Sequence, residues 1–200
     1  NRNALDEFKS AHIKNSNFFD IDKYSNQKTK LPHMLPDKNY WEKIMSELGV
    51  KNSDHIVIYD NSDTISSCRV WYTFLYFNHN PNLVSILDGG FKKWLKEKKD
   101  ITKNILKFKK SSYFAQENTS MVLNKDQIDT NINNKSFELI DARGRERFLG
   151  LQQEARKELR SGNIKGSKNM PYTELINSDD HTFKKKNELI SIFEKNKIDI

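Results

Sequence analysis

Alternation of strand-like and helix-like segments between residues 55 and 94 constrains the fold of this chain more than any other feature. The segments, in chain order, are a strand at 56–59, a polar loop at 60–64, an aromatic-rich helix at 66–77, a strand at 83–87, a Gly89-Gly90 break and a helix that begins at Phe91. Such alternation predicts an α/β fold with a central parallel sheet flanked by helices. In such folds, ligands usually bind at the loop that follows the carboxyl end of a strand.

A weak internal repeat indicates that this fold occurs twice. Residues 8–16 (FKSAHIKNS) and residues 159–167 (LRSGNIKGS) share one frame: apolar, basic, Ser, small, polar, Ile, Lys, turn residue and Ser. The offset between Ser10 and Ser161 is 151 residues, which is far too long for a solenoid. The repeat therefore suggests two copies of one domain.

Two α/β domains are expected, at residues 1–100 and 125–200. The segment between them, 101–124, is polar and lysine-rich with weak periodicity, so we interpret it as a linker that wraps one domain and joins the other. A short helix at 125–134 is expected to lead into the second domain.

Comparison of the two copies indicates that both are incomplete. A buried-type strand at 137–141 precedes the second repeat, whereas only nine residues precede Ser10 in the first. Matching helices follow the repeats at 38–48 and 186–195, and the sequence then stops where a counterpart of the 56–59 strand should begin. We therefore expect the first domain to lack its first strand and the second to be cut before its ligand loop.

The net charge of +7 and the isoelectric point near 9.3 raise the question of nucleic-acid binding. The alternative is compositional drift in an A/T-rich genome, because Lys, Asn and Ile are abundant throughout the chain. No zinc-finger, helix-turn-helix or aromatic RNA-platform pattern accompanies the lysines. We therefore expect no nucleic-acid partner, and a positive field that attracts small anions.

Cysteine usage and hydropathy bear on the compartment. The single cysteine excludes an internal disulfide framework and suits a reducing compartment, so we expect a cytoplasmic protein, or one of the mitochondrial matrix in a eukaryote. No apolar run approaches the roughly 20 residues of a membrane span, so no membrane partner is expected. The first residue is Asn rather than Met, so the lack of a targeting peptide says little.

A series of motifs resembles the tandem-rhodanese family of thiosulfate and 3-mercaptopyruvate sulfurtransferases. In the first half the matching residues are 12–13, 18–22 (FFDID), 31–36 (LPHMLP), 55–60, 69–71 and 87–95. In the second half they are 140–143, 147–148, 154–156, 161–162 and 169–172. The matches run in order from about Leu5 to the end of the sequence, and the linker contributes little to them.

The resemblance implies a two-domain enzyme whose second domain carries a catalytic cysteine directly after a strand. Inward-pointing backbone N–H groups at a helix N-terminus would stabilise the thiolate and its persulfide. The thiolate would take a sulfane sulfur from a small anionic donor and pass it to a thiol, to cyanide or to a thioredoxin-like acceptor. No metal or organic cofactor is implied. The alternative is a non-catalytic rhodanese-type module that binds anions or a partner.

The only cysteine, Cys68, does not occupy the position of the family nucleophile. The equivalent position in the first copy is about Asp60, and Cys68 comes eight residues later, within the predicted helix. Its spacing to Trp71 and Leu75 places it on an apolar face, where a thiol behaves as a small buried hydrophobe. We expect Cys68 to be inert, the nucleophile to lie beyond residue 200, and the 200-residue chain alone to be inactive.

Two arginines of the second copy match the family residues that bind the anionic end of the substrate, Arg147 and Arg156. Guanidinium forks bind carboxylate or sulfonate oxygens in a bidentate way that lysine cannot reproduce. The alternative for each is a surface salt bridge with Glu146 or Glu154.

An acid–imidazole pair of the first copy, Asp22 and His33, matches the mercaptopyruvate-type members of the family. There the pair is implied to reach a serine of the catalytic loop, so that the carboxylate orients a histidine that activates a hydroxyl. The alternative for His33 is a satisfied loop histidine between two prolines. For Arg69 we expect an interdomain or helix-terminus contact rather than a catalytic one.

Overall fold

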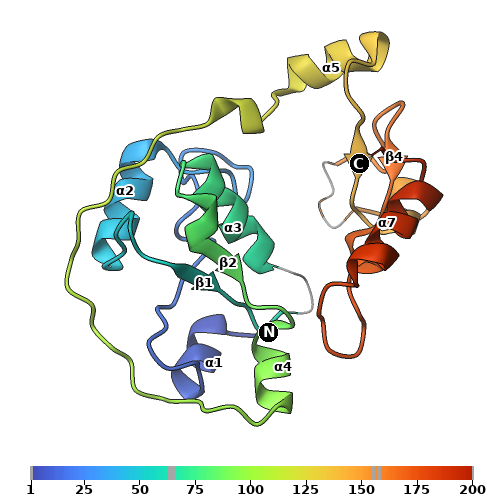
Figure 1. The fold of residues 1–200 in the computed structure, drawn as a ribbon. Coiled ribbons are helices and arrows are strands. Elements are labelled where there is room, and N and C mark those ends of the chain that lie inside the picture. Colours follow the sequence, from blue (N-terminus) through green and yellow to red (C-terminus); the bar gives the residue numbers. More distant parts are fainter. Residues whose placement is uncertain (1, 63–65, 155, 157–158, 200) are drawn as a thin grey trace. The chain divides into compact units, whose positions relative to one another are not determined.

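The computed structural model describes residues 2–62, 66–154, 156 and 159–199, which form two compact units, Asn1–Met121 and Val122–Ile200 (Figure 1). The end of the predicted 60–64 loop lies outside the described residues, as does Ala155 of the second-half motifs. No helix in the described part of the chain combines the length and apolar character needed to cross a bilayer.

The first unit is built around a two-stranded parallel sheet. Strand β1 (Ile56–Ile58) pairs with β2 (Val84–Ile86), with Ile56 opposite Val84. The remaining elements are the helices α1 (Ala4–Ser10), α2 (Lys38–Glu47), α3 (Ser66–Tyr76) and α4 (Gly90–Lys96), and the 3-10 turns Pro81–Leu83 and Thr119–Met121. Helix α3 packs against both strands. The predicted α/β class with parallel sheets flanked by helices is confirmed.

Helix α2 forms because its N-terminus is capped and one face is apolar. The Asp37 carboxylate accepts the Tyr40 N–H at 2.9 Å, which satisfies one of the free donors of the first turn. Trp41, Ile44 and Met45 follow at helical spacing and are buried. The apolar face therefore turns inward and supplies these three residues to the core.

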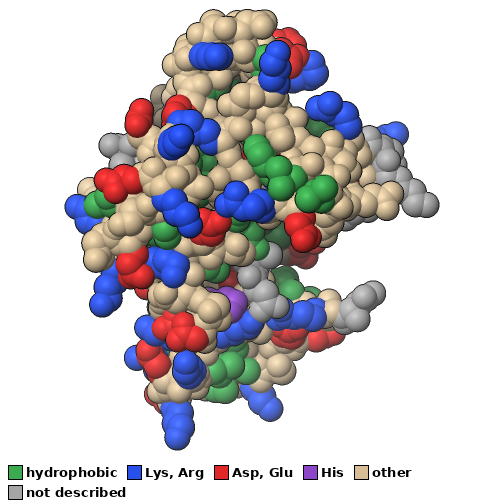
Figure 2. Space-filling view, turned by 90° about the vertical axis from the view of Figure 1, so that its right-hand side faces the viewer, with side chains coloured by type: hydrophobic (Ala, Val, Ile, Leu, Met, Phe, Trp, Pro, Cys, Tyr) green, Lys and Arg blue, Asp and Glu red, His purple; other side chains and the backbone are tan. Residues whose placement is uncertain are grey.

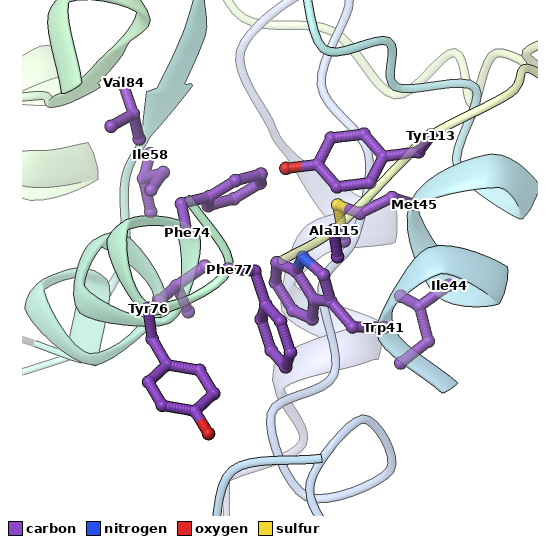
Figure 3. Close-up of a cluster of buried hydrophobic side chains, with 11 residues drawn as sticks. Trp41, Ile44, Met45, Ile58, Phe74, Tyr76, Phe77, Val84, Tyr113 and Ala115 are labelled. Atoms are coloured by element: carbon purple, nitrogen blue, oxygen red, sulfur yellow. The ribbon is translucent and has the colours of Figure 1, made fainter. Parts of the chain in front are cut away.

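Aromatic packing between α2 and α3 forms the centre of the core (Figure 3). The Trp41 ring stacks on Phe77 at 5.1 Å between centroids, and Phe74 meets it edge-on at the same distance. Each such pair contributes about 0.5–1.5 kcal/mol beyond its buried area. This cluster fixes the position of α2, and of the segment that leads into it, relative to α3.

Residues 101–121, called the strap below, belong to the first unit. They follow α4 as an open, largely non-helical segment along the outside of the unit (Figure 1). Tyr113 and Ala115 of the strap are buried in the core, and the Ser111 N–H donates to the Ser46 carbonyl. The segment predicted to be a linker thus contributes side chains to the core of the first unit before the chain enters the second.

The second unit has a shorter parallel pair, β3 (Ile140–Asp141) with β4 (Lys168–Asn169). Its other elements are the helices α5 (Lys125–Asn134), α6 (Arg145–Phe148) and α7 (Lys186–Lys195) and the 3-10 turn Tyr172–Leu175. The predicted strand at 137–141 is shortened to its last two residues. The reason is that the buried Asn131 side chain bonds both the N–H and the carbonyl of Phe137, so these groups are not available to a sheet.

Candidate functional site

The loop after β1 holds a carboxylate where an anion would bind. Asp60 Oδ2 accepts the Ser67 N–H of the first α3 turn at 2.7 Å, and Oδ1 lies 3.4 Å from the Ser62 N–H. The Asp60 carbonyl accepts the Phe91 N–H at 2.9 Å and lies 2.8 Å from where a Cβ on Gly90 would stand. Backbone donors at a helix N-terminus favour negative charge. The chain's own carboxylate therefore uses the anion-binding donors of this loop.

Cys68 is the third residue of α3 and is half-buried. Burial, followed by the nearby Asp60 carboxylate, raises the pKa of its thiol to about 11. The group is therefore a neutral thiol near pH 7, and the thiol form is a poor nucleophile. This agrees with the prediction that Cys68 is inert.

The structure brings Asp22 and His33 together. His33 Nε2 lies 2.6 Å from Asp22 Oδ1, and the two side chains are 49% and 83% exposed. His33 adopts the left-handed backbone conformation, with φ of 55°, which is uncommon for a side chain other than glycine. The pair therefore depends on a specific conformation of the loop that carries His33.

Arg69 of α3 holds that loop. Its Nη2 donates to the His33 carbonyl at 2.6 Å, and the Asn26 N–H closes the same loop by donating to the Met34 carbonyl at 2.9 Å. Burial lowers the pKa of the guanidinium, yet Arg69 remains charged at neutral pH. The structure thus gives Arg69 a bond within the first unit that was not predicted from the sequence. The sequence offered one signal for it, a basic residue on an otherwise uncharged helix.

A shallow apolar pocket lies beside this loop. Its walls come mainly from Phe19, Met34, Trp41 and Val70, and its lining includes both His33 and Arg69. The pocket places the imidazole beside mainly apolar side chains.

In the second unit, the loop after β3 holds an ion-pair network. Arg143 grips the Asp141 carboxylate with Nε and Nη2, at 3.0 and 2.6 Å, and donates from Nη1 to Glu154 Oε1 at 2.7 Å. Arg147 Nη2 donates to the other oxygen of Glu154 at 2.5 Å. Glu154 is therefore a bridge between two arginines.

The electrostatics of this network favour the ionised carboxylates. The Arg147 hydrogen bond, together with the charges of Arg147 and Arg143, lowers the pKa of Glu154, whose side chain is only 3% exposed. The Arg143 fork in the same way lowers the pKa of Asp141. The sequence motif shows Arg143 two residues after Asp141, but it does not reveal that Glu154, expected only as a salt-bridge partner of Arg147 or Arg156, also binds Arg143.

The two arginines predicted to bind substrate differ in their surroundings. Arg147 shares one nitrogen with Glu154, as the salt-bridge alternative proposed, and its side chain is 40% exposed. Arg156 is exposed, and its side chain has no hydrogen bond or ion pair with the described residues. No hydrogen bond or ion pair among the described residues joins Arg156 to the network of Arg147. No cluster of three His, Cys, Asp or Glu side chains able to hold a metal occurs in the described ranges.

Comparisons with known proteins agree with this geometry. Residues 3–97 match the Rhodanese-like domain family. The chain is 36% identical over 201 residues to the 3-mercaptopyruvate sulfurtransferase of Rattus norvegicus and 34% identical over 202 residues to the thiosulfate sulfurtransferase of Mus musculus. Each alignment covers all of this chain and 67% of the relative.

Solved structures give the same result. The 3-mercaptopyruvate sulfotransferase SseA of Escherichia coli superposes with a TM-score of 0.88 at 30% identity, over 99% of this chain and 72% of the other. The Tum1 protein of Saccharomyces cerevisiae superposes with a TM-score of 0.88 at 26% identity, over 100% of this chain and 70% of the other.

Proposed function

We propose sulfur transfer as the function of this protein, because the chain belongs to the family of thiosulfate and 3-mercaptopyruvate sulfurtransferases. The donor would be 3-mercaptopyruvate or thiosulfate, and the acceptor a thiol, cyanide or a thioredoxin-like protein. Residues 1–100 would form a non-catalytic domain and 125–200 part of the catalytic one. The single-cysteine composition suits the cytoplasm or another reducing compartment.

The sulfur carrier would be a cysteine persulfide formed outside these 200 residues. Cys68 is the only thiol of the sequence, and the burial that raises its pKa to about 11 supports a nucleophile other than Cys68. With 3-mercaptopyruvate, the attacking thiolate would take the sulfur, the carbon–sulfur bond would break, and pyruvate would leave after gaining a proton. The persulfide would then give its outer sulfur to the acceptor.

The His33–Asp22 pair is the observation that supports this proposal most. When Nε2–H donates to the Asp22 carboxylate, Nδ1 of the ring keeps a lone pair that can accept a proton. The carboxylate would stabilise the imidazolium that forms. A hydroxyl placed beside His33 could thus be activated. Because the pair matches the mercaptopyruvate-type members of the family, it favours 3-mercaptopyruvate over thiosulfate as the donor.

Arg147 and Arg156 would bind the anionic end of the donor. Arg147 uses one nitrogen on Glu154, which leaves the rest of its fork for a carboxylate or sulfonate oxygen. In the complete protein, Arg147→Ala should lower kcat/KM by about 1.5–3 kcal/mol, the range of a charge-assisted hydrogen bond. Arg160→Ala, which removes an exposed guanidinium of the same unit, is the matched control.

Sulfide release from 3-mercaptopyruvate and thiocyanate formation from thiosulfate and cyanide test the proposal. In the complete protein, His33→Asn should lower turnover of 3-mercaptopyruvate more than that of thiosulfate, and His55→Asn should change neither. Equal rates for His33→Asn and the parent protein would contradict the general-base role. Absence of turnover with both donors would support the alternative, a rhodanese-type module that binds anions or a partner.

A further inference from the structure

One short stretch carries the whole net charge of the protein. Residues 92–110, called the basic strip below, contain nine lysines and two acidic residues, for a net charge of +7. The rest of the chain holds 25 of the 34 basic and 25 of the 27 acidic residues, which cancel. Compositional drift toward lysine would make the whole surface basic, whereas basic and acidic side chains are interspersed on the face drawn in Figure 2.

Most of these lysines have no ion-pair partner among the described residues. Glu97 pairs with Lys93 and Lys99 at 3.2 Å each. Other lysines of the strip form no ion pair with a described residue, and their side chains are all exposed. They are Lys96, Lys98, Lys103, Lys107, Lys109 and Lys110. The apolar side chains between them are also exposed, with Ile105 at 55%, Leu106 at 45% and Phe108 at 39%.

The second half of the strip, residues 103–110, is anchored through the residues on either side of it, Thr102 and Ser111, and its backbone is left open in the middle. His12 and Thr102 exchange two backbone hydrogen bonds at 2.9 and 2.8 Å, and Ser111 N–H donates to Ser46. Between these anchors, the N–H and carbonyl groups of residues 105–110 make no hydrogen bond within the described part of the chain. The segment packs closely against Gly49, since a Cβ on residue 49 would lie only 2.8 Å from the Lys109 carbonyl oxygen.

The unbonded backbone N–H and carbonyl groups of residues 105–110, with lysines beside them, favour some classes of partner over others. Lipid is disfavoured, because unpaired N–H and carbonyl groups are costly in hydrocarbon. Nucleic acid is disfavoured, because the strip contains no arginine, the side chain that best matches phosphate and guanine. An extended peptide can satisfy the backbone groups by adding as a strand, and acidic side chains on it would meet the lysines.

We propose that residues 103–110 form a docking edge for an acidic, extended segment of a partner protein. The segment pairs with the open backbone of 105–110 and sets its carboxylates against Lys103, Lys107 and Lys109. This docking does not depend on sulfur transfer, since neither proposed donor-binding arginine lies in the strip.

Amide NMR of the ¹⁵N-labelled chain, titrated with a capped peptide of alternating Glu and Val, tests the proposal. Shift changes and slowed hydrogen exchange should centre on residues 105–110. Lys103→Glu/Lys107→Glu/Lys109→Glu should weaken binding about tenfold or more, given three lost ion pairs and three like charges gained. The matched control replaces the other lysine triplet, Lys184, Lys185 and Lys186, with Glu and should bind as the parent does.

Further probes separate strand pairing from charge alone. A peptide of the same charge with alternate backbone nitrogens methylated should bind much more weakly, since it cannot complete the ladder. Equal affinity of the methylated peptide would overturn the proposal, and so would equal losses in both triplet variants. Preference for vesicles of equal parts phosphatidylserine and phosphatidylcholine, or for duplex DNA, over the peptide would also overturn it.

Discussion

Replacing Arg69 with Met tests whether one charged hydrogen bond fixes the loop that carries His33. Arg69 Nη2 donates to the His33 carbonyl at 2.6 Å, and the variant removes this donor while keeping an apolar stem of similar length against α3. The loop would then have to hold His33 at φ of 55° without help. We expect the loop to open more often and the unit to lose stability.

The expected loss of stability is estimated from the hydrogen bond that is removed and from the burial and backbone strain that oppose it. A hydrogen bond to a charged group contributes about 1.5–3 kcal/mol, and the half-burial of Arg69 offsets part of that gain. The left-handed conformation of His33 costs about 1–2 kcal/mol. Loss of about 1–2 kcal/mol is therefore expected, which changes the ratio of closed to open loop by a factor of roughly 5–30.

Two measurements check this expectation. Urea unfolding, followed by the fluorescence of the buried Trp41, should show the loss in stability, and exchange of the Asn26 amide should quicken because its acceptor, the Met34 carbonyl, is in the same loop. Arg145→Met removes an exposed pair with Glu174 and should cost about 0–1 kcal/mol. Unchanged Asn26 exchange in Arg69→Met would refute the reasoning.

A double-mutant cycle isolates the role of the backbone strain. His33→Gly relieves the left-handed strain and keeps the carbonyl that Arg69 bonds, so Arg69→Met should cost about the same in the His33→Gly background as in the parent. Unequal costs in the two backgrounds would show that Arg69 also acts on the side chain of residue 33.

Three further predictions concern single side chains. The pKa of Glu154 is lower in the folded state than in the unfolded state, so Glu154 contributes to stability above its unfolded-state pKa. This contribution is lost as the pH falls through the folded-state pKa. Glu154→Gln should therefore reduce the loss of stability at acid pH in denaturation curves, and Glu146→Gln should not. Cys68 should react with iodoacetamide slowly at pH 7 and faster up to pH of about 11, and rapid labelling at pH 7 would contradict its buried environment. Gly49→Ala should destabilise by about 1–3 kcal/mol, clearly more than Gly166→Ala, which has a similar positive φ but an open surround.

The helices could be predicted from sequence because their apolar spacing and caps are local. The predicted 186–195 helix is α7, and the 66–77 helix is α3 with one residue fewer. The strand at 137–141 was overestimated, because whether Phe137 joins a sheet depends on the Asn131 side chain six residues away. The path of the strap could not be read from periodicity, since Tyr113 and Ala115 are buried by contacts with distant residues.

The candidate site was predictable to the level of residue types and not to that of their partners. The motif placed Asp22 near His33, and the structure joins them. It could not show that Arg69 holds the His33 carbonyl, because that bond links positions 36 residues apart. It also could not decide how much of Arg147 remains for a substrate once Glu154 has taken one nitrogen.

Two carboxylates explain why the units should differ in anion binding. In the first unit, Asp60 accepts backbone donors of the loop after β1, so an external anion would have to displace a group fixed to the chain. In the second unit, Glu154 occupies one nitrogen of Arg147 and does not bond Arg156. Donor groups already matched by a tethered carboxylate contribute little net affinity, whereas unmatched guanidinium nitrogens contribute the full charge-assisted bond. A small anionic donor is therefore expected to bind at Arg147 and Arg156 and not at the β1 loop. Asp60→Ala, which frees the Ser67 N–H, should leave the affinity at the two arginines unchanged, allow a second, weaker anion to bind at the β1 loop, and destabilise the first unit.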